Sequence, residues 1–189
     1  MTYDNIAIPT YLIGSLCNEF ENHDEFDIVK TYSNSANQWQ LFRNIIEDVG
    51  SGHDDDVIVI CSEGHQFDET YNKTAFLTDV MESAKLGTQL LVGGCCDFYN
   101  LVSISKRLYW VDTFREAHFY VIFRTAFQRI LRQELHDNGN IEDVLSNTLP
   151  NKLLVYPFVS KIPTECDVHK HLKIYRDIIL RYNLSSVNE

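Results

Sequence analysis

Two side chains that could do chemistry follow an apolar run at residues 57–61. The run reads "VIVIC", and Ser62, Glu63, Gly64 and His65 come after it. A carboxylate and an imidazole at the end of a strand can bind a divalent cation, or they can act as acid and base. The alternative is a polar turn in which Gly64 supplies backbone freedom. The spacing alone leaves both interpretations open.

A second group of reactive side chains lies in "KRLYWVDTFREAHF", residues 106–119. The group combines acidic, imidazole and basic side chains, namely Asp112, Glu116, His118, Lys106, Arg107 and Arg115. Carboxylates and imidazoles transfer protons, and arginines pair with phosphate groups. The alternative is an aromatic-rich packing segment that carries charges at the surface.

Three further carboxylates, Asp54, Asp55 and Asp56, precede the apolar run instead of following it. In open α/β sheets, ligands bind beyond the carboxyl ends of the strands, so we predict a solvated turn at this position. The chain has no G-x-x-x-x-G-K-[ST], G-x-G-x-x-G, G-x-S-x-G or H-E-x-x-H motif. The common nucleotide cradles and the simplest hydrolase and metalloprotease interpretations are therefore excluded.

The elements that must position these residues alternate between strands and helices. Apolar runs predict strands at residues 7–14, 54–61, 88–94, 117–123 and 152–158. Amphipathic patterns predict helices at residues 35–50, 71–87, 125–135, 141–150 and 171–182. Residues 95–114 are expected to form a long connection. This alternation is typical of βαβ units and predicts an α/β fold with a mostly parallel sheet.

Two of the predicted helices begin with capping boxes, Ser35 with Gln38 and Thr125 with Gln128. The residues expected to face the sheet are Trp39, Phe42, Ile45, Ile46 and Val49 in the first helix, and Phe76, Leu77, Val80, Met81 and Ala84 in the second. No internal repeat or linker divides the chain.

Length and charge narrow the class of protein. At 189 residues the chain suits a single domain, residues 1–189. The net charge of -11 opposes general binding to nucleic acid or to an anionic membrane. No stretch approaches the roughly 20 apolar residues of a transmembrane helix, so we expect no transmembrane segment and a cytoplasmic location.

The five cysteines include no C-x-x-C pair. They fit neither a disulfide framework nor a four-thiolate zinc site, so we predict that they are reduced. A metal or redox role for the adjacent Cys95 and Cys96 is the alternative.

Seven segments together resemble the small bacterial glycosyltransferases of family 25, which act in lipopolysaccharide or other surface-glycan synthesis. The segments are "IPTYLI", "NQWQLFRNII", "DDDVIVICSEGHQF", "LLVGG", "LYWVDTF" followed by "FYVIFRTAFQRIL", and "LLVYPFVS". The resemblance is spread over most of the chain. It implies a GT-A-like, Rossmann-like three-layer sandwich, a nucleotide-diphosphate sugar donor, a glycan acceptor and a divalent metal, manganese or magnesium.

The resemblance implies a metal site, and the hypothesis of a glycosyltransferase adds roles for further residues. Glu63 and His65 match the metal-binding acidic motif, although Ser62 and Gly64 stand where the family has carboxylates. Asp112 or Glu116 would deprotonate the acceptor hydroxyl. Arg107, Arg115 and Trp110 would bind the donor. The alternative is a catalytically inactive relative that keeps the fold and acts as a sugar-binding or partner-binding module.

Overall fold

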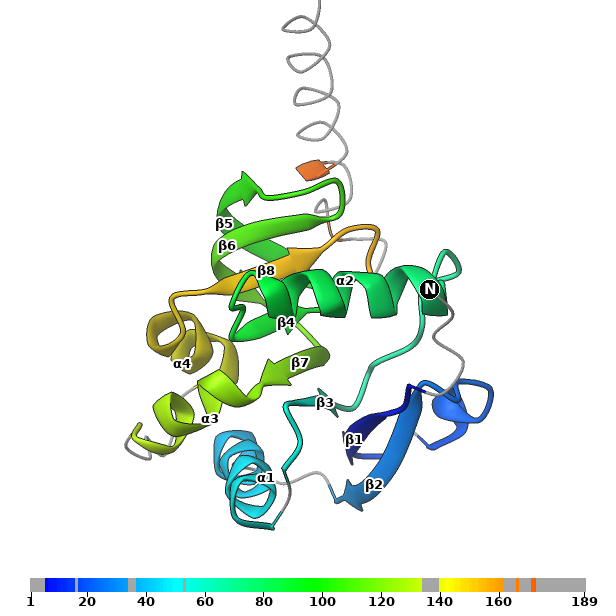
Figure 1. Cartoon of the computed structure of the whole chain (residues 1–189), viewed down its shortest axis with the longest axis vertical. Helices are drawn as coiled ribbons and strands as arrows, with labels where there is room; N and C mark the ends of the chain where they lie inside the picture. The colour runs from blue at the N-terminus through cyan, green and yellow to red at the C-terminus, as the bar shows by residue number, and fades with distance from the viewer. Residues whose placement is uncertain are drawn as a thin grey trace, which may run out of the picture.

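The computed structural model describes residues 6–15, 17–33, 37–52, 54–133, 140–161, 166 and 171–172. Figure 1 shows the arrangement of the elements. The strands are β1 (Ile8–Ile13), β2 (Phe26–Tyr32), β3 (Val57–Cys61), β4 (Leu90–Val92), β5 (Asp97–Ser103), β6 (Leu108–Arg115), β7 (Phe119–Phe123) and β8 (Lys152–Val155). The helices are η1 (Cys17–Phe20), α1 (Gln38–Gly52), α2 (Lys73–Lys85), α3 (Arg124–Leu131) and α4 (Ile141–Thr148).

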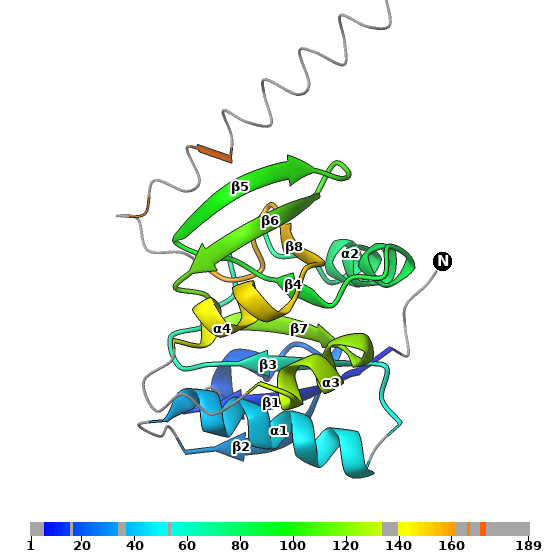
Figure 2. The ribbon, with the colours of Figure 1, turned by 90° about the vertical axis from the view of Figure 1, so that its left-hand side faces the viewer.

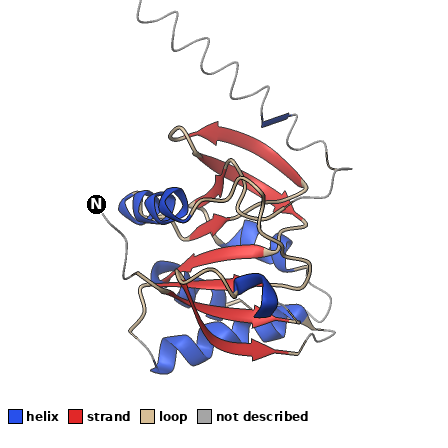
Figure 3. Cartoon of the chain, turned by 90° about the vertical axis from the view of Figure 1, so that its right-hand side faces the viewer, coloured by secondary structure: helices blue, strands red, loops and turns tan. Residues whose placement is uncertain are grey.

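All eight of these strands belong to one twisted sheet, in the order β2-β1-β3-β7-β4-β8-β6-β5 (Figure 3). The pairs β1–β2, β1–β3 and β4–β8 are parallel. The pairs β3–β7, β4–β7, β5–β6 and β6–β8 are antiparallel. The sheet is therefore mixed, which corrects the expectation of a mostly parallel sheet. The α/β class itself is confirmed.

The sheet lies between two layers of helices because strand residues alternate between its faces. Ile58 and Ile60 belong to the core cluster that includes apolar residues of α1, α3 and α4. Val59 and Cys61 belong to the opposite cluster, which includes residues of η1 and α2. Figure 2 shows α1, α3 and α4 in front of the strands, with α2 on a different side of the molecule. Helices therefore cover both faces of the sheet.

Helix α1 covers the sheet through the five apolar residues that its periodicity predicted, and all five are buried. Its start differs from the prediction. Ser35 lies outside the described residues, and the Asn37 side chain accepts the Gln40 N–H at 2.9 Å. The helix therefore begins at Gln38 with Asn37 as a capping side chain, and it continues to Gly52.

Two predictions about the other helices are wrong. In α2, Met81 and Ala84 are exposed, and Asp79 and Ser83 are buried in their place. Asp79 can be buried because Arg107 bonds both of its carboxylate oxygens. The predicted capping box at Thr125 is also absent, since α3 starts at Arg124 without a side-chain cap.

Two regions form strands that the sequence did not indicate. Strand β2 is an edge strand whose residues are mostly exposed, so its pattern is not that of a buried strand. Residues 97–115, expected to be mostly a connection, form the β5–β6 hairpin. The predicted helix at residues 171–182 lies outside the described residues except for His171 and Leu172.

Cys96 and Cys166 form a disulfide between positions 70 residues apart, with Cα atoms separated by 5.3 Å. The expectation that every cysteine is reduced is therefore corrected for this pair. Cys61 and Cys95 are free and buried. Within the described ranges, no helix has the length and apolar character needed to cross a membrane.

Candidate functional site

The carboxyl ends of β1 and β3 lie side by side in the sheet. Gly14 follows β1 with a φ of +95°, and a Cβ added to it would lie 2.9 Å from the Glu63 Cβ. A side chain at position 14 would therefore clash with Glu63. The absence of a side chain there allows the backbone after β1 to approach Glu63 closely.

Strand β7 brings His118 to the same edge because β7 runs antiparallel to β3. The Ser62 N–H donates to the His118 carbonyl at 2.9 Å, and the Ser62 hydroxyl lies 3.2 Å from the His118 Nδ1. Gly64, with a φ of +98°, places its Cα against the His118 ring; an added Cβ would lie 3.3 Å from the ring Cε1. The His118 imidazole thus lies against both Ser62 and Gly64.

A small cavity of about 90 Å³ opens at this edge, and we call it the Glu63 cavity. Its polar lining consists of Gln38, Ser62, Glu63, His118, Tyr120 and Glu142, and its apolar lining of Ile13, Phe42, Ile60, Ala117 and Ile141. A second, more open hollow of about 330 Å³ is lined by Gly14, Ser15, Thr31, Tyr32, Ser33 and Glu63, and we call it the β1–β2 hollow. Glu63 lines both spaces.

Glu142 reaches the Glu63 cavity from the first turn of α4. Asn140 fixes this turn by accepting the Glu142 N–H at 2.9 Å. The Glu142 Oε1 accepts the Ala117 N–H at 3.3 Å and lies 3.2 Å from the Tyr120 hydroxyl, which also donates to the Ala117 carbonyl at 2.6 Å. The carboxylate is therefore held in place by the turn that leads into β7.

His65 lies in a different environment from Glu63. Its side chain is buried, its Nδ1 is 2.6 Å from the Ser160 hydroxyl, and its ring packs against Phe20, Phe67 and Phe119. Burial, together with the nearby His118 and His23, lowers the pKa of His65 to about 3. The imidazole is thus neutral at physiological pH and does not line the Glu63 cavity.

The residues predicted on β6 are dispersed. Asp112 accepts a hydrogen bond from the Asn100 amide at 3.1 Å, and the Trp110 indole donates to the Pro150 carbonyl at 3.0 Å. Arg115 pairs with Asp143 of α4 at 3.0 Å. None of these three side chains lines either space at the carboxyl edge.

Arg107 and Glu116 also lie apart from the Glu63 cavity. Arg107 is occupied by Asp79 of α2, with the Nε 2.9 Å from one carboxylate oxygen. Glu116 is exposed in the turn between β6 and β7, with a φ of +54°, and its carboxylate lies near the sulfur atoms of Cys96 and Cys166. The structure therefore does not gather the predicted residues into one site.

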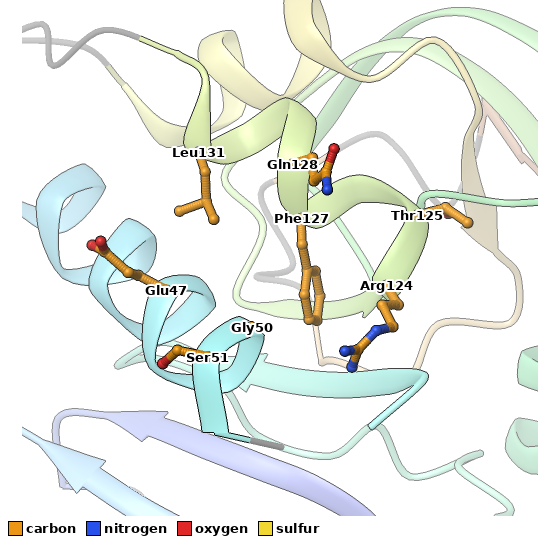
Figure 4. Close-up of a pocket in the computed structure, with 8 residues that line it drawn as sticks. All are labelled: Glu47, Gly50, Ser51, Arg124, Thr125, Phe127, Gln128 and Leu131. Atoms are coloured by element: carbon orange, nitrogen blue, oxygen red, sulfur yellow. The ribbon is translucent and has the colours of Figure 1, made fainter. Parts of the chain in front are cut away.

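A hollow of about 630 Å³ lies at the opposite edge of the sheet, between α1 and α3 (Figure 4). Arg124, which lines it, donates to the Asp55 carbonyl at 3.1 Å and pairs with the exposed Asp54 at 3.5 Å. The acidic run before β3 is thus a largely solvated turn, as its position before the strand predicted.

Sequence reasoning placed Glu63 at the carboxyl edge but missed the groups that share its cavity. The sequence indicates His118 only as a member of the segment at residues 106–119, and no sequence pattern points to Glu142. The pairing of β7 with β3 brings His118 to Ser62 across 56 positions of the chain. No local sequence pattern predicts which strands pair, so the contact between His118 and Ser62 could not be predicted.

The fold is that of an α/β protein with a mixed sheet between two helical layers. Neither a family model nor a curated protein sequence matches the chain. Solved structures do match it, among them the crystal structure of A197 from STIV, with a TM-score of 0.56. That match has 14% sequence identity and covers 78% of this chain and 81% of A197. The likeness shows the fold alone.

Proposed function

We propose that this chain is a glycosyltransferase with a GT-A-like fold, and that it binds a nucleotide-diphosphate sugar at the carboxyl edge of the sheet. The sugar would pass to a hydroxyl group of a surface-glycan or lipopolysaccharide acceptor. The supporting observation is that Ser62, Glu63, His118 and Glu142 line one cavity where β1 and β3 end. This edge is where open α/β sheets bind their ligands.

The β1–β2 hollow suits the nucleoside part of such a donor. Tyr32 offers an aromatic side chain, and Ser15, Thr31 and Ser33 offer hydroxyl groups. Because Glu63 lines both spaces, the diphosphate would lie beside its carboxylate.

In this proposal, side chains of the Glu63 cavity bind a divalent cation that is shared with the diphosphate. Magnesium is commonly held by one or two carboxylates together with substrate phosphates, and Glu63 and Glu142 supply two carboxylates. A bound cation would neutralise charge on the departing diphosphate. In this proposal Glu142 takes the place that the sequence suggested for His65, because the His65 imidazole is enclosed by aromatic rings.

His118 is the side chain in this cavity best suited to take the proton of the acceptor hydroxyl. An imidazole nitrogen can accept a proton from a hydroxyl group, and the His118 Nδ1 lies 3.2 Å from the Ser62 hydroxyl. Asp112 and Glu116 stay predictions for this role, and neither lines the Glu63 cavity.

Calorimetric titration with uridine, guanosine and cytidine diphosphate sugars, with and without Mn²⁺, tests this proposal. We expect one donor class to bind in a metal-dependent manner. Glu63→Gln should weaken that binding at least about tenfold, because it removes one cation ligand. Release of nucleoside diphosphate in the presence of an acceptor glycan would then report turnover.

Glu47→Gln is the matched control, since Glu47 is exposed on α1 and lines the hollow at the opposite edge. It should bind the donor as the unaltered chain does. Failure of every donor to bind the folded chain would refute the proposal, as would equal losses in the two variants.

One observation favours an inactive sugar-binding or partner-binding module as the second candidate. Among the described residues that line the Glu63 cavity and the β1–β2 hollow, none is Lys or Arg. Cationic side chains often stabilise a departing diphosphate. Saturable sugar binding without any release of nucleoside diphosphate would support this candidate over the enzyme.

A further inference from the structure

Three potential metal ligands, Cys96, Glu116 and Cys166, lie close together beside the turn between β6 and β7. Cys96 follows β4, Glu116 lies between β6 and β7, and Cys166 lies after β8. The two sulfur atoms and one carboxylate oxygen all lie within 4.8 Å of one another. No other group of three or more His, Cys, Asp or Glu side chains in the described part of the chain is as close.

The backbone fixes the position of Glu116 relative to Cys96. The Cys96 N–H donates to the Arg115 carbonyl at 3.1 Å, so the residue before Glu116 is bonded to the first cysteine. Glu116 itself has a φ of +54°, a conformation that residues other than glycine adopt rarely and that is enriched at functional sites. Its exposed carboxylate is thus held beside the two sulfur atoms by the fold, without a salt bridge among those of the described residues.

Two thiolates and a carboxylate form a suitable ligand set for zinc. Zn²⁺ binds Cys sulfur and Glu oxygen, and sites with three protein ligands leave the fourth tetrahedral position to water or another ligand. In the disulfide neither sulfur is a thiolate, so the same residues cannot bind the ion in that form. The chemistry of the group therefore depends on its oxidation state.

We propose that Cys96, Cys166 and Glu116 form a redox-controlled zinc site. In the oxidised chain, the two cysteines are joined as the disulfide. A dithiol reductant breaks the S–S bond by transferring two electrons, which yields two thiols and the cyclic disulfide of the reductant. Zn²⁺ then displaces the two thiol protons and forms two Zn–S bonds, and Glu116 supplies the third protein ligand.

Either form of the site would link Cys166 to the connection after β4. Cys96 and Cys166 are partly buried and pack against the core cluster that contains α1, α3 and α4, and Leu172 is fully buried in that cluster. Reduction alone would break this link, whereas reduction followed by zinc binding would keep it. This inference does not rest on the proposed transferase activity.

Cobalt titration of the full chain tests the site, because Co²⁺ replaces zinc and its thiolate complexes absorb light. The chain is reduced with a dithiol and freed of the reductant under argon, while a second sample stays oxidised. We expect about one Co²⁺ per reduced chain, with a thiolate-to-cobalt band that zinc removes, and no band in the oxidised chain.

Three variants identify the ligands. Glu116→Gln should keep the disulfide and weaken cobalt binding at least about tenfold. Cys96→Ser should abolish the charge-transfer band, and Cys95→Ser, the adjacent control, should retain it. Circular dichroism verifies the fold of each sample. A folded reduced chain without cobalt binding, binding that persists in Cys96→Ser, or unfolding of the reduced chain despite added zinc would overturn the inference.

Discussion

The His65 imidazole is enclosed by the rings of Phe20, Phe67 and Phe119 and bonded to the Ser160 hydroxyl. Its surroundings favour the neutral ring, because a charged imidazole would lose its hydration without gaining a carboxylate partner. Glu63, two positions away, lines the cavity at the carboxyl edge instead. Two side chains that are close in sequence thus have separate physical roles.

The burial of His65 predicts acid sensitivity. Its pKa is lowered to about 3 in the folded chain, compared with about 6.5 for an exposed histidine. Between these values the unfolded chain binds more protons, so the free energy of unfolding should fall as the pH is lowered from about 6.5 toward 3. The contribution of one histidine reaches at most ~1.4 kcal/mol per pH unit.

Urea unfolding at a series of pH values measures this effect. His65→Leu, which cannot be protonated, should show a smaller loss of stability on acidification than the unaltered chain. Parallel curves for the two proteins across this range would show that His65 is not the group responsible.

Single residues also show how much of the candidate site could be predicted. The position of Glu63 followed from a local pattern, since a buried strand that ends in polar residues places them at the carboxyl edge. The direction in which His65 points could not be predicted, because it depends on an aromatic cluster drawn from η1, β7 and the segment after β3. The contribution of Glu142 depends on where α4 packs.

At the scale of elements, Asp79 and Arg107 join α2 to the turn of the β5–β6 hairpin. Asp79 is buried, and the Arg107 Nε lies 2.9 and 3.1 Å from its two oxygens. Arg107→Met would leave a buried carboxylate without its cation, and we expect a loss of about 2 kcal/mol in the free energy of unfolding, below the range for fully buried pairs because Arg107 is partly exposed.

The double variant Asp79→Leu, Arg107→Met separates two effects on the free energy of unfolding: the loss caused by an unpaired buried charge, and the net contribution of the ion pair itself. Replacing both partners removes the buried charge, so the double variant should be more stable than Arg107→Met alone. Chemical denaturation of the three proteins measures the difference. A double variant that is less stable than the single one would contradict this account.

Gly93 controls the fit between the end of β4 and β7. A Cβ at Gly93 would lie 2.6 Å from the Phe119 Cδ1, and Phe119 is fully buried. Gly93→Ala should therefore destabilise the chain by about 1–3 kcal/mol through overpacking. Gly50 in α1 has no atom within 4 Å of such a Cβ, so Gly50→Ala should stabilise the chain by about 0.5–1 kcal/mol.

The midpoints of urea unfolding for the two alanine variants provide the measurement. Opposite shifts are expected, and a neutral Gly93→Ala would show that the Phe119 ring can move aside.

The sequence predicts most reliably the elements whose buried apolar residues form one continuous face. The five apolar residues of α1 recur at helical spacing, and all of them are buried. Elements stabilised by polar contacts were not predictable in the same way. In α2, periodicity predicts that Met81 is buried. The helix instead buries Asp79, because Arg107, 28 positions away in the sequence, pairs with its carboxylate. In β2, most residues are exposed, so alternation gave no strand signal.

For the whole molecule, the α/β class followed from the alternation of elements, but the neighbours of each strand did not. Strand β7 lies between β3 and β4, and it is antiparallel to both. The apolar sequence of β7 indicates a central strand, and all five of its residues are buried. Whether the strand runs parallel or antiparallel to its neighbours depends on the connections in the rest of the sheet, which its own sequence does not specify. This insertion brings His118 to Ser62, so the sheet order and the candidate site were unpredictable for the same reason.

The position of strand β8 in the sheet affects the order in which the sheet can form during synthesis. Strand β8 pairs with β4 on one side and with β6 on the other, although it is the last strand in the described residues. During synthesis, β4 and β6 leave the ribosome before β8, the strand that lies between them in the sheet. The β5–β6 hairpin therefore cannot pair with the other part of the sheet, which consists of β2, β1, β3, β7 and β4, until residues 152–155 have emerged.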